Sequence, residues 1–471
     1  MVTRPPPWRT GLVYLAMILG VIGTYAAIRS FGETLPAPVA GLVPSAPSSA
    51  HGPSLAHLLL ALATVTVAAR GIGAAGARWL RQPPVMGEIV AGIALGPSVL
   101  GALAPTVQSF LLPSDVNLAP IANLGVVLFM FLVGLDLDLG LLRRTGHAAL
   151  AIAHASIAAP FLLGAVGALA LYTEYAPAGV SFTSFSLFIA VAMSVTAFPV
   201  LARILHDRGV THSSIGATAL TCAAVDDATA WTLLATVAGI ATSEAGSVFR
   251  VVIAVAAYIL GMFVVVRPLV RWLVERAEAS EEPLSRGALA AALVGLLLSA
   301  AVTEAAGIHA LFGAFLLGAL FPHDGRVARE IRARVEDLVV VLFLPVFFAY
   351  TGLRTQIGLL HDAHDWLVAG GVVVLATVGK VGGSYVAGRF VGLSRRESAA
   401  IGILMNTRGL MAFVVLNVGL DLGVITPTAF AMLVVMALVT TFATSPLLDL
   451  VLGRGREAWF PADPTAPLAL P

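Results

Sequence analysis

The stretch Ala223-Ala224-Val225-Asp226-Asp227-Ala228-Thr229-Ala230-Trp231 places two adjacent carboxylates within an apolar run, Ile215 to Ala241, that is long enough to cross a bilayer as a helix. An aspartate in the middle of such a helix costs about 2.5 to 3.5 kcal/mol on insertion scales. Acids kept at this depth indicate a functional site, and the first interpretation is that the site handles ions or protons.

The composition places the rest of the chain in a membrane as well. Of 471 residues, 58% are hydrophobic and 11% are charged, and the mean hydropathy is +0.94. These values are typical of a polytopic membrane protein surrounded by lipid. Cys222 is the only cysteine, which excludes disulfides and thiolate metal sites within one chain. The net charge of +1 gives no indication of a nucleic-acid partner.

We predict an all-α membrane protein of 13 to 14 transmembrane helices from the apolar runs. The predicted spans are Gly11–Ile28, Leu55–Ala77, Met86–Leu103, Leu118–Leu139, Ala148–Tyr172, Ser184–Leu205, Ile215–Ala241, Val248–Val274, Ala288–Ala305, Ile308–Phe321, Leu338–Leu353, Trp366–Phe390, Ala399–Leu420 and Pro427–Leu452.

Arginines cluster in every second connection between these spans, which predicts that both termini are cytoplasmic in the cell membrane. The first span could instead be a cleaved signal peptide, although its apolar part is long for one. We divide the chain into an extra helix with an extracytoplasmic linker rich in Pro, Ala, Ser and Gly (1–54), a membrane domain (55–453) and a short cytoplasmic tail (454–471).

The membrane domain contains an internal repeat. Gly134-Leu135-Asp136 at the end of the fourth span matches Gly352-Leu353-Arg354 in the eleventh, and small residues recur between 91–97 in the third span and 313–318 in the tenth. Both offsets are seven spans, an odd number, so the two halves lie inverted in the membrane. The repeats cover about 86–241 and 308–452. Inverted repeats are typical of secondary transporters, with the substrate site near the midplane.

The repeat predicts two discontinuous helices that cross, one in each half. The sixth span contains Ser194-Val195-Thr196-Ala197-Phe198-Pro199, where Pro199 removes an amide donor and disturbs the turn before it. The thirteenth contains Asn406-Thr407-Arg408-Gly409, a polar tetrad in an apolar run. Irregular backbone at this depth persists only where protein or a water-filled cavity satisfies it. The two breaks therefore predict where the site lies, with half-helix ends adding partial charges beside the acids.

The two acids lie about 100° apart on a helix, so they need not share a role. Asp226 could make a structural ion pair, and Asp227 is the stronger candidate for an ion ligand. Lys380, the only lysine, lies deep in the twelfth span and is the predicted partner. An ammonium loses its proton on desolvation more readily than a guanidinium does. The alternative for Lys380 is a side chain that snorkels to the interface.

The remaining candidates are polar residues around the breaks and at one helix end. Thr196 and Asn406 carry neutral oxygens that could bind a monovalent cation or could satisfy backbone freed by the breaks. We expect Arg408 to hold half-helix carbonyls. Asp136 and Asp138 are expected at the cytoplasmic mouth, or simply at a solvated edge. We find no nucleophile, metal cluster or cofactor loop, so we predict neither an enzyme nor a cofactor.

Together these motifs resemble the monovalent cation:proton antiporter-2 family, the bacterial sodium/proton exchangers and their potassium-handling relatives. The similar stretch runs from about Leu55 to about Leu452 and includes Gly87-Glu88, Gly96-Pro97, Gly134-Leu135-Asp136, Thr196 to Pro199, Asp226-Asp227, Lys380 and Asn406-Thr407-Arg408-Gly409. The resemblance implies a homodimer, each chain with a dimerisation domain and a mobile ion-carrying domain. It also implies that Asp227 binds cation and proton alternately, that Asp226 pairs with Lys380, and that exchange is electrogenic.

The residues at the two breaks are more similar to those of the potassium-handling branch of the family. Both Na⁺ and K⁺ therefore remain candidates for the transported cation. We hypothesise proton-coupled exchange of one of these cations by alternating access, with cation and protons competing for the same carboxylates. Protonation of Asp226 would release Lys380, which would carry a second proton. Two alternatives remain: a cation channel, which would show single-channel current steps, and a carrier of a small organic solute coupled to Na⁺ or H⁺.

Overall fold

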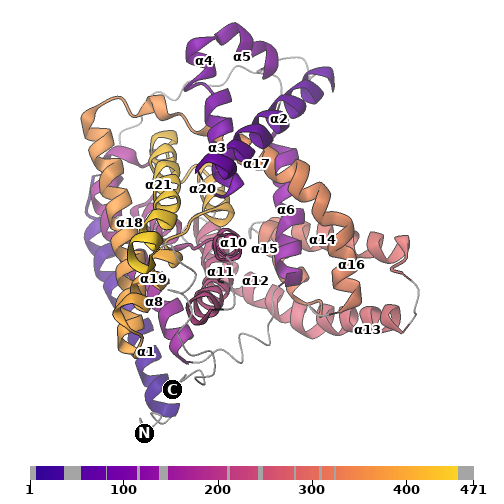
Figure 1. Cartoon of the computed structure of the whole chain (residues 1–471). Coiled ribbons are helices and arrows are strands. Elements are labelled where there is room, and N and C mark those ends of the chain that lie inside the picture. The colour runs from indigo at the N-terminus through magenta and orange to yellow at the C-terminus, as the bar shows by residue number, and fades with distance from the viewer. Residues whose placement is uncertain are drawn as a thin grey trace. The chain divides into compact units, whose positions relative to one another are not determined.

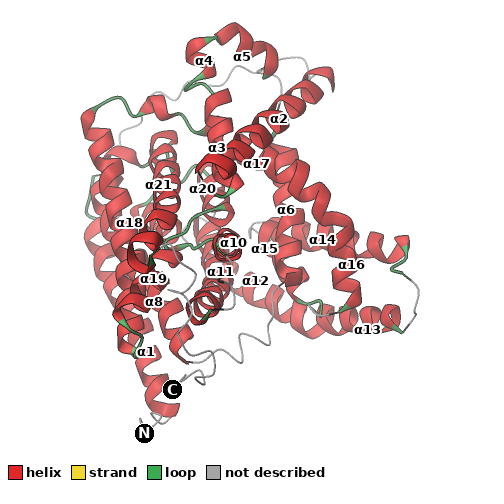
Figure 2. Ribbon diagram, viewed as in Figure 1, coloured by secondary structure: helices red, strands yellow, loops and turns green. Residues whose placement is uncertain are grey.

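All regular secondary structure is helical in the part of the chain that the computed structural model describes, and loops and turns connect the helices (Figure 2). The described residues are 7–36, 55–80, 82–113, 117–136, 147–208, 210, 213–241, 248–279, 283–306, 310–322 and 325–453. Each predicted span coincides with helix in these ranges. Within the described ranges, eight helices are long and apolar enough to cross a membrane, and five shorter ones are apolar. The prediction of an all-α polytopic membrane protein is confirmed.

The chain divides into two compact units that do not follow chain order. Unit 1 comprises Met1–Val43, Leu141–Ala230 and Ile357–Pro471. Its helices are α1 (Pro7–Gly32), α8 (His147–Tyr175), α9 (Phe182–Ser194), α10 (Phe198–Asp207), α11 (Ser214–Ala241, assigned to this unit as far as Ala230), the 3₁₀ turn η3 (Ile357–Leu359), α18 (Ala363–Phe390), α19 (Arg395–Met405), α20 (Leu410–Asp421) and α21 (Pro427–Leu452).

Unit 2 comprises Pro44–Gly140 and Trp231–Gln356. Its helices are α2 (Leu55–Leu80), α3 (Pro84–Leu95), α4 (Leu100–Leu103), α5 (Pro105–Leu111), α6 (Ala119–Asp136), α12 (Val248–Gly261), α13 (Arg267–Glu278), α14 (Arg286–Ala305), α15 (Ala310–Ala319), α16 (Arg326–Leu338) and α17 (Leu344–Arg354), with π turns η1 (Met262–Val266) and η2 (Val339–Phe343).

In unit 1, α8 and α18 run side by side at very short range (Figure 1). A Cβ atom at Gly379 would lie 2.7 Å from Cα of Pro160, and one at Gly383 would lie 2.7 Å from the carbonyl oxygen of Ala155. Only glycine permits this approach at either position, and the approach brings Lys380, which follows Gly379, against α8. An apolar core within this unit is built from side chains of α8, α10, α11, α18, α19 and α21.

In unit 2, the tight contacts are between α3 and α17 and between α6 and α15. A Cβ atom at Gly92 would lie 2.1 Å from the carbonyl oxygen of Ala349, and one at Gly134 would lie 2.3 Å from that of Phe315. The repeat pairs the third span with the tenth and the fourth with the eleventh, which are α3 with α15 and α6 with α17. If α3 is replaced by its repeat partner α15, and α17 by its repeat partner α6, the α3–α17 contact becomes the α15–α6 contact. A two-fold relation between the repeats requires this correspondence.

The bounds of most predicted spans differ from those of the observed helices by a few residues, and two spans differ most. The third was predicted to continue to Leu103, but α3 ends at Leu95, because Gly96 precedes Pro97 and is held in an extended conformation. The eleventh was predicted to begin at Leu338, but helix begins at Arg326 and continues without a gap to Arg354. Hydropathy detects only the apolar part of such a helix, and α16 is amphipathic.

Candidate functional site

The two predicted breaks meet inside unit 1. The helix ends at Ser194 and resumes at Phe198 in one span, and ends at Met405 and resumes at Leu410 in the other. The backbone N–H of Ala197 donates to the carbonyl of Thr407 (3.0 Å), and Thr196 Oγ1 donates to the carbonyl of Met405 (3.0 Å). Each break thus satisfies backbone groups of the other, as irregular backbone within a membrane requires. The prediction of two crossing discontinuous helices is confirmed.

The local sequence explains why helix stops at these places. Pro199 is the second residue of α10, where its missing N–H removes no helical hydrogen bond. At the other break, a Cβ atom on Gly409 would lie 2.4 Å from Cγ2 of Val200 and 3.0 Å from Cβ of Ala197. A glycine is therefore needed where α20 begins, because any side chain would separate the two breaks.

Arg408 lies across the carboxyl end of α9 and has no exposed surface. Its Nη1 donates to the carbonyls of Val195 (2.7 Å) and Ala192 (3.1 Å), and its Nη2 donates to that of Met193 (2.5 Å). The last carbonyls of a helix carry partial negative charge, which a guanidinium compensates. Its backbone N–H and C=O both bond to the hydroxyl of Thr441 on α21. The positive charge is therefore committed to the half-helix.

Asp226 and Lys380 form a buried ion pair, with 2.6 Å between Lys380 Nζ and Asp226 Oδ2 and no exposed surface on either side chain. The ammonium also donates to the carbonyl of Ser194, the last residue of α9. Thr196 Oγ1 and Ser156 Oγ also lie within hydrogen-bond distance of this carboxylate oxygen, Ser156 at 3.3 Å. Each hydroxyl shares its one proton with a backbone carbonyl, that of Met405 for Thr196 and that of Ala153 for Ser156. A buried pair is tolerated when further hydrogen bonds satisfy it, and here the two hydroxyls supplement the ammonium at Oδ2.

Three other oxygens near the crossing lack a donor. They are Oδ1 of Asp226, Oδ1 of Asp227 and Oδ1 of Asn406, all buried and without a hydrogen-bond partner in the described part of the chain. The Asp227 carboxylate receives one hydrogen bond from the backbone N–H of Phe198, at the positive end of half-helix α10. Buried acceptors without donors need an explanation, and a bound cation or proton is the one that fits carboxylate and amide oxygens.

The predicted site residues fall into two groups. Asp226, Lys380 and Thr196 are joined by direct hydrogen bonds, Asp227 follows Asp226 on α11, and Asn406 lies in the second break, directly after α19. Thr407 contributes its carbonyl to the crossing. The side chains of Pro199 and Asp136 are not described, and Asp138 lies outside the described residues. The prediction that two acids line a cytoplasmic mouth therefore stays a prediction.

Ser156 was not predicted, although its hydroxyl contacts the ion pair. The sequence does carry a signal: Ser156 stands four residues before Pro160 inside one predicted span, so its carbonyl loses the partner that a helix normally supplies. A polar residue at a proline-disturbed turn of an apolar helix is a candidate for a contact with another helix.

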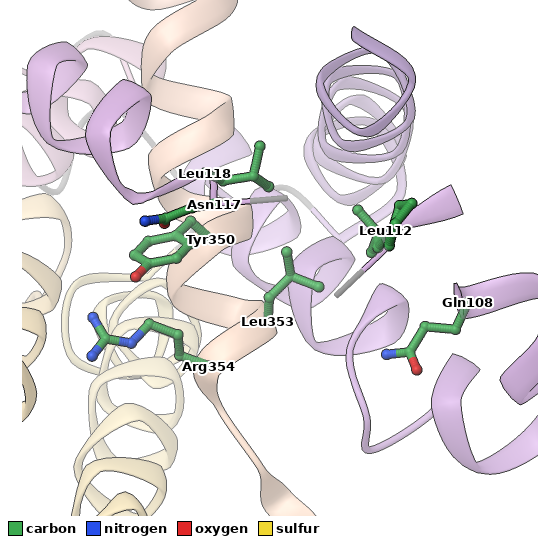
Figure 3. A pocket seen from close by; sticks show the side chains of 8 residues that line it. Gln108, Leu112, Asn117, Leu118, Tyr350, Leu353 and Arg354 are labelled. Atoms are coloured by element: carbon green, nitrogen blue, oxygen red, sulfur yellow. The ribbon is translucent and has the colours of Figure 1, made fainter. Parts of the chain in front are cut away.

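Unit 2 holds a cavity of about 240 Å³ that contains none of these residues. It is lined by Gln108, Leu112, Pro113, Asn117, Leu118, Tyr350, Leu353 and Arg354 (Figure 3). The guanidinium of Arg354 lies 5.3 Å from the ring centre of Tyr350, where a cation and an aromatic ring attract each other. Its described lining residues include no acid, and the crossing in unit 1 is the better candidate for the site.

Comparisons with known proteins identify the family of the chain. Residues 61–450 match the family described as sodium/hydrogen exchanger, transmembrane. The chain is 43% identical over 398 residues to the Na⁺/H⁺ antiporter NhaS4 of Synechocystis, covering 83% of this chain and 97% of that protein. It is 34% identical over 381 residues to the K⁺/H⁺ antiporter 1 of Saccharomyces cerevisiae, covering 79% of this chain and 44% of that one.

A plant relative and a solved structure extend the comparison. Cation/H⁺ antiporter 18 of Arabidopsis thaliana is 39% identical, with 81% of this chain and 47% of the plant protein covered. The chain thus spans under half the length of the yeast and plant relatives. The sodium proton antiporter MjNhaP1 of Methanocaldococcus jannaschii has the same fold, with a TM-score of 0.61 at 15% identity over 84% of this chain and 98% of that structure.

Proposed function

This chain belongs to the sodium/hydrogen exchanger family and is a cation:proton exchange transporter, and we propose that Asp227 is the carboxylate at which its cation and its proton alternate. The observation that carries the proposal is the Asp227 oxygen that is buried and lacks a donor, beside an acid already held by Lys380. An aspartate with one free oxygen can bind either a cation or a proton, but not both at once.

The transported cation is Na⁺ or K⁺. The related proteins are named for Na⁺ and for K⁺, and the oxygens available, two carboxylate and one amide, suit either ion. Asp227 Oδ1, Asp226 Oδ1 and Asn406 Oδ1 would supply the protein ligands. The negative charge of the two acids would attract the cation, and the positive end of α10 would repel it. Binding would therefore be weak enough for the cation to leave.

Exchange follows if the site opens to one side of the membrane at a time. A cation that binds at Asp227 expels the proton there, and a proton that binds on the other side expels the cation. The Asp226–Lys380 pair would set the charge of the site: a cation that bonds to Asp226 competes with the ammonium for the carboxylate. In this scheme Arg408, whose charge is committed to α9, contributes structure and no ligand.

We place the transporter in the cytoplasmic membrane as a homodimer with both termini in the cytoplasm. The alternating arginine-rich connections support this orientation. Exposed apolar side chains on unit 2, among them Leu260, Val264 and Leu298, give it a surface suited to lipid or to a second chain.

The test is dissipation of a pH gradient in proteoliposomes, with Na⁺, K⁺ or Li⁺ added in turn. We expect one or more cations to collapse the gradient in the wild type and none in Asp227→Asn. Asp421→Asn, which changes an exposed aspartate at the end of α20, is the matched control and should behave as wild type. If no cation collapses the gradient in folded wild-type protein, the proposal is wrong and an organic substrate becomes the leading alternative.

A further inference from the structure

Two buried hydroxyls beyond the ion pair have no role in the scheme above. Ser384 on α18 and Ser398 on α19 have no exposed surface, and neither hydroxyl oxygen has a hydrogen-bond partner in the described residues. Buried hydroxyls in proteins almost always bond to protein or to an ordered water. Two unsatisfied hydroxyls in one region therefore indicate bound water between them.

Helix geometry places both hydroxyls in line with Lys380. Ser384 follows Lys380 by four residues on α18, so it lies on the same side of the helix and about 6 Å further along it. Gly388 is four residues further again, and a Cβ atom there would lie 2.8 Å from Ser398 Oγ. The hydroxyl of Ser398 thus occupies the next place in the line. We call Lys380, Ser384 and Ser398 the serine row.

The spacing of the serine row suits water. A step of about 6 Å is too long for one hydrogen bond but matches two hydrogen bonds through one water molecule. The row runs along α18 where this helix packs against α19, since a Cβ atom on Gly402 of α19 would lie 2.8 Å from the carbonyl oxygen of Val381 on α18. On α18, Gly383 packs on α8. Hydroxyls at the α18–α19 contact offer each water a donor and an acceptor.

The outer end of the row lies near the surface of unit 1. Ser398 is one helical turn after Ser394, the exposed residue that caps α19 in a capping box with Glu397. The arginines around this end are exposed, and the alternation of basic connections predicts that it faces the cytoplasm. The row therefore leads from the buried ammonium to within one turn of solvent.

We infer that the serine row, with its bridging waters, carries protons between Lys380 and the α18–α19 end of unit 1, apart from the cation at Asp227. The inference rests on the proposed function. In each transfer the ammonium gives one proton to the first water, and each hydroxyl accepts a proton on its Lys380 side and releases its own on the other. The last water passes one proton to solvent, and Lys380 remains as a neutral amine.

The lysine itself would gate this route. In the structure Lys380 Nζ donates to Asp226 and to the carbonyl of Ser194, and no hydrogen bond in the described residues joins it to Ser384. The row is engaged only when the ammonium leaves Asp226, which happens when a cation takes that carboxylate. While the pair is closed the route is sealed, so protons do not leak through a resting transporter.

The test compares two fluxes in the same proteoliposomes. Uptake of labelled cation driven by a pH gradient needs proton transfer, whereas self-exchange of labelled for unlabelled cation at equal pH does not. In Ser384→Ala/Ser398→Ala we expect gradient-driven uptake to fall roughly tenfold or more, as the loss of a proton-transfer group does in enzymes. Self-exchange should stay at the wild-type rate, and the slowing of uptake in heavy water should become larger than in wild type.

Two further variants separate proton transfer from packing. Ser384→Cys keeps the volume but relays protons poorly, so it should resemble Ser384→Ala. Thr444→Val removes a buried hydroxyl that is satisfied within its own helix, by the carbonyl of Thr440 at 3.1 Å, and should leave both fluxes unchanged. An equal fall of both fluxes in the serine variants, or no change in either, would overturn the inference. Absence of both fluxes in wild type would instead show that the proposed function is wrong.

Discussion

Unit 1 and unit 2 are both bundles of apolar helices, but they differ in how many charged side chains they bury. Among the described residues, unit 1 buries four charged side chains (Asp226, Asp227, Lys380 and Arg408), and unit 2 buries only Glu88. Both units pack glycines against backbone, at Gly379 and Gly383 in unit 1 and at Gly92, Gly134, Gly313, Gly318 and Gly352 in unit 2. Close helix packing is therefore common to both units, and the cost of buried charge is concentrated in unit 1, where the chemistry is.

The largest expected effect is the loss of exchange in Asp227→Asn. The amide cannot release a proton, so gradient-driven cation flux should fall by about two orders of magnitude or more. The measurement is labelled-cation uptake in proteoliposomes, normalised to folded protein. Thermal stability in detergent should stay close to wild type, because no cation of the described protein pairs with Asp227. Flux above a tenth of the wild-type rate would remove Asp227 from the exchange step.

Removal of the lysine should damage the fold of unit 1 itself. Lys380→Met leaves the carboxylate of Asp226 buried and unpaired, a change that costs about 3 to 5 kcal/mol where it has been measured. The melting temperature should fall markedly in Lys380→Met and recover in Asp226→Asn/Lys380→Met, since the double variant removes both charges of the pair. Equal melting of the single and double variants would mean that the pair is not coupled.

Asp226→Asn alone tests what the pair contributes to transport. If Lys380 carries a second proton, the charge moved per cycle should decrease by about one elementary charge when the acid that holds the ammonium is lost. The measurement is the reversal potential of cation flux under imposed gradients. An unchanged ratio of charge to cation would exclude this role of the pair.

A side chain on a packing glycine should damage unit 2 without changing the chemistry. Gly92→Ala places a Cβ atom 2.1 Å from the carbonyl of Ala349, and overpacking of this kind costs about 1 to 3 kcal/mol. We expect a lower melting temperature, with the cation dependence of the remaining flux unchanged. Gly370→Ala on α18, where a Cβ atom meets nothing within 4 Å, is the control and should melt as wild type.

The smallest expected effect concerns the end of half-helix α10. Arg208 donates to Asp449 Oδ1 (2.7 Å) and to the carbonyl of Ser445 (2.9 Å), and both charged side chains are partly exposed. Exposed ion pairs contribute about 0 to 1 kcal/mol, so Arg208→Gln should lower the melting temperature only slightly and leave exchange intact. A loss of exchange would show that the position of α10 depends on this contact.

The hydropathy of the sequence and the residues that interrupt its apolar runs were sufficient to predict most of this fold. The Pro199 and Asn406-Thr407-Arg408-Gly409 interruptions predicted the two breaks, and the odd offset of the repeat predicted that they would meet. Helix ends and side-chain partners were less predictable, because they depend on tertiary contacts. The amphipathic α16 escaped a search for apolar runs, and Gly96-Pro97 ended α3 early.

The finer details of the site could not be predicted, because they depend on distances between helices. The sequence predicted that Lys380 pairs with Asp226, a contact that the structure contains, but not that Ser156 and Thr196 share the same carboxylate oxygen. It also gave no indication of which oxygens would remain without a donor. Those oxygens are set by the rotation of α11 and the approach of α8 to α18, which glycines at Gly379 and Gly383 permit.

If a cation and a proton compete for Asp227, cation binding must release protons, and this release can be measured. Purified protein in weakly buffered detergent is titrated with Na⁺ and then with K⁺ while the pH is recorded. We predict release of about one proton or more per chain at saturation, with an apparent cation affinity that falls as pH falls, and no release from Asp227→Asn. Cation binding to wild type without proton release, or equal release from the variant, would show that the two ions do not compete for Asp227.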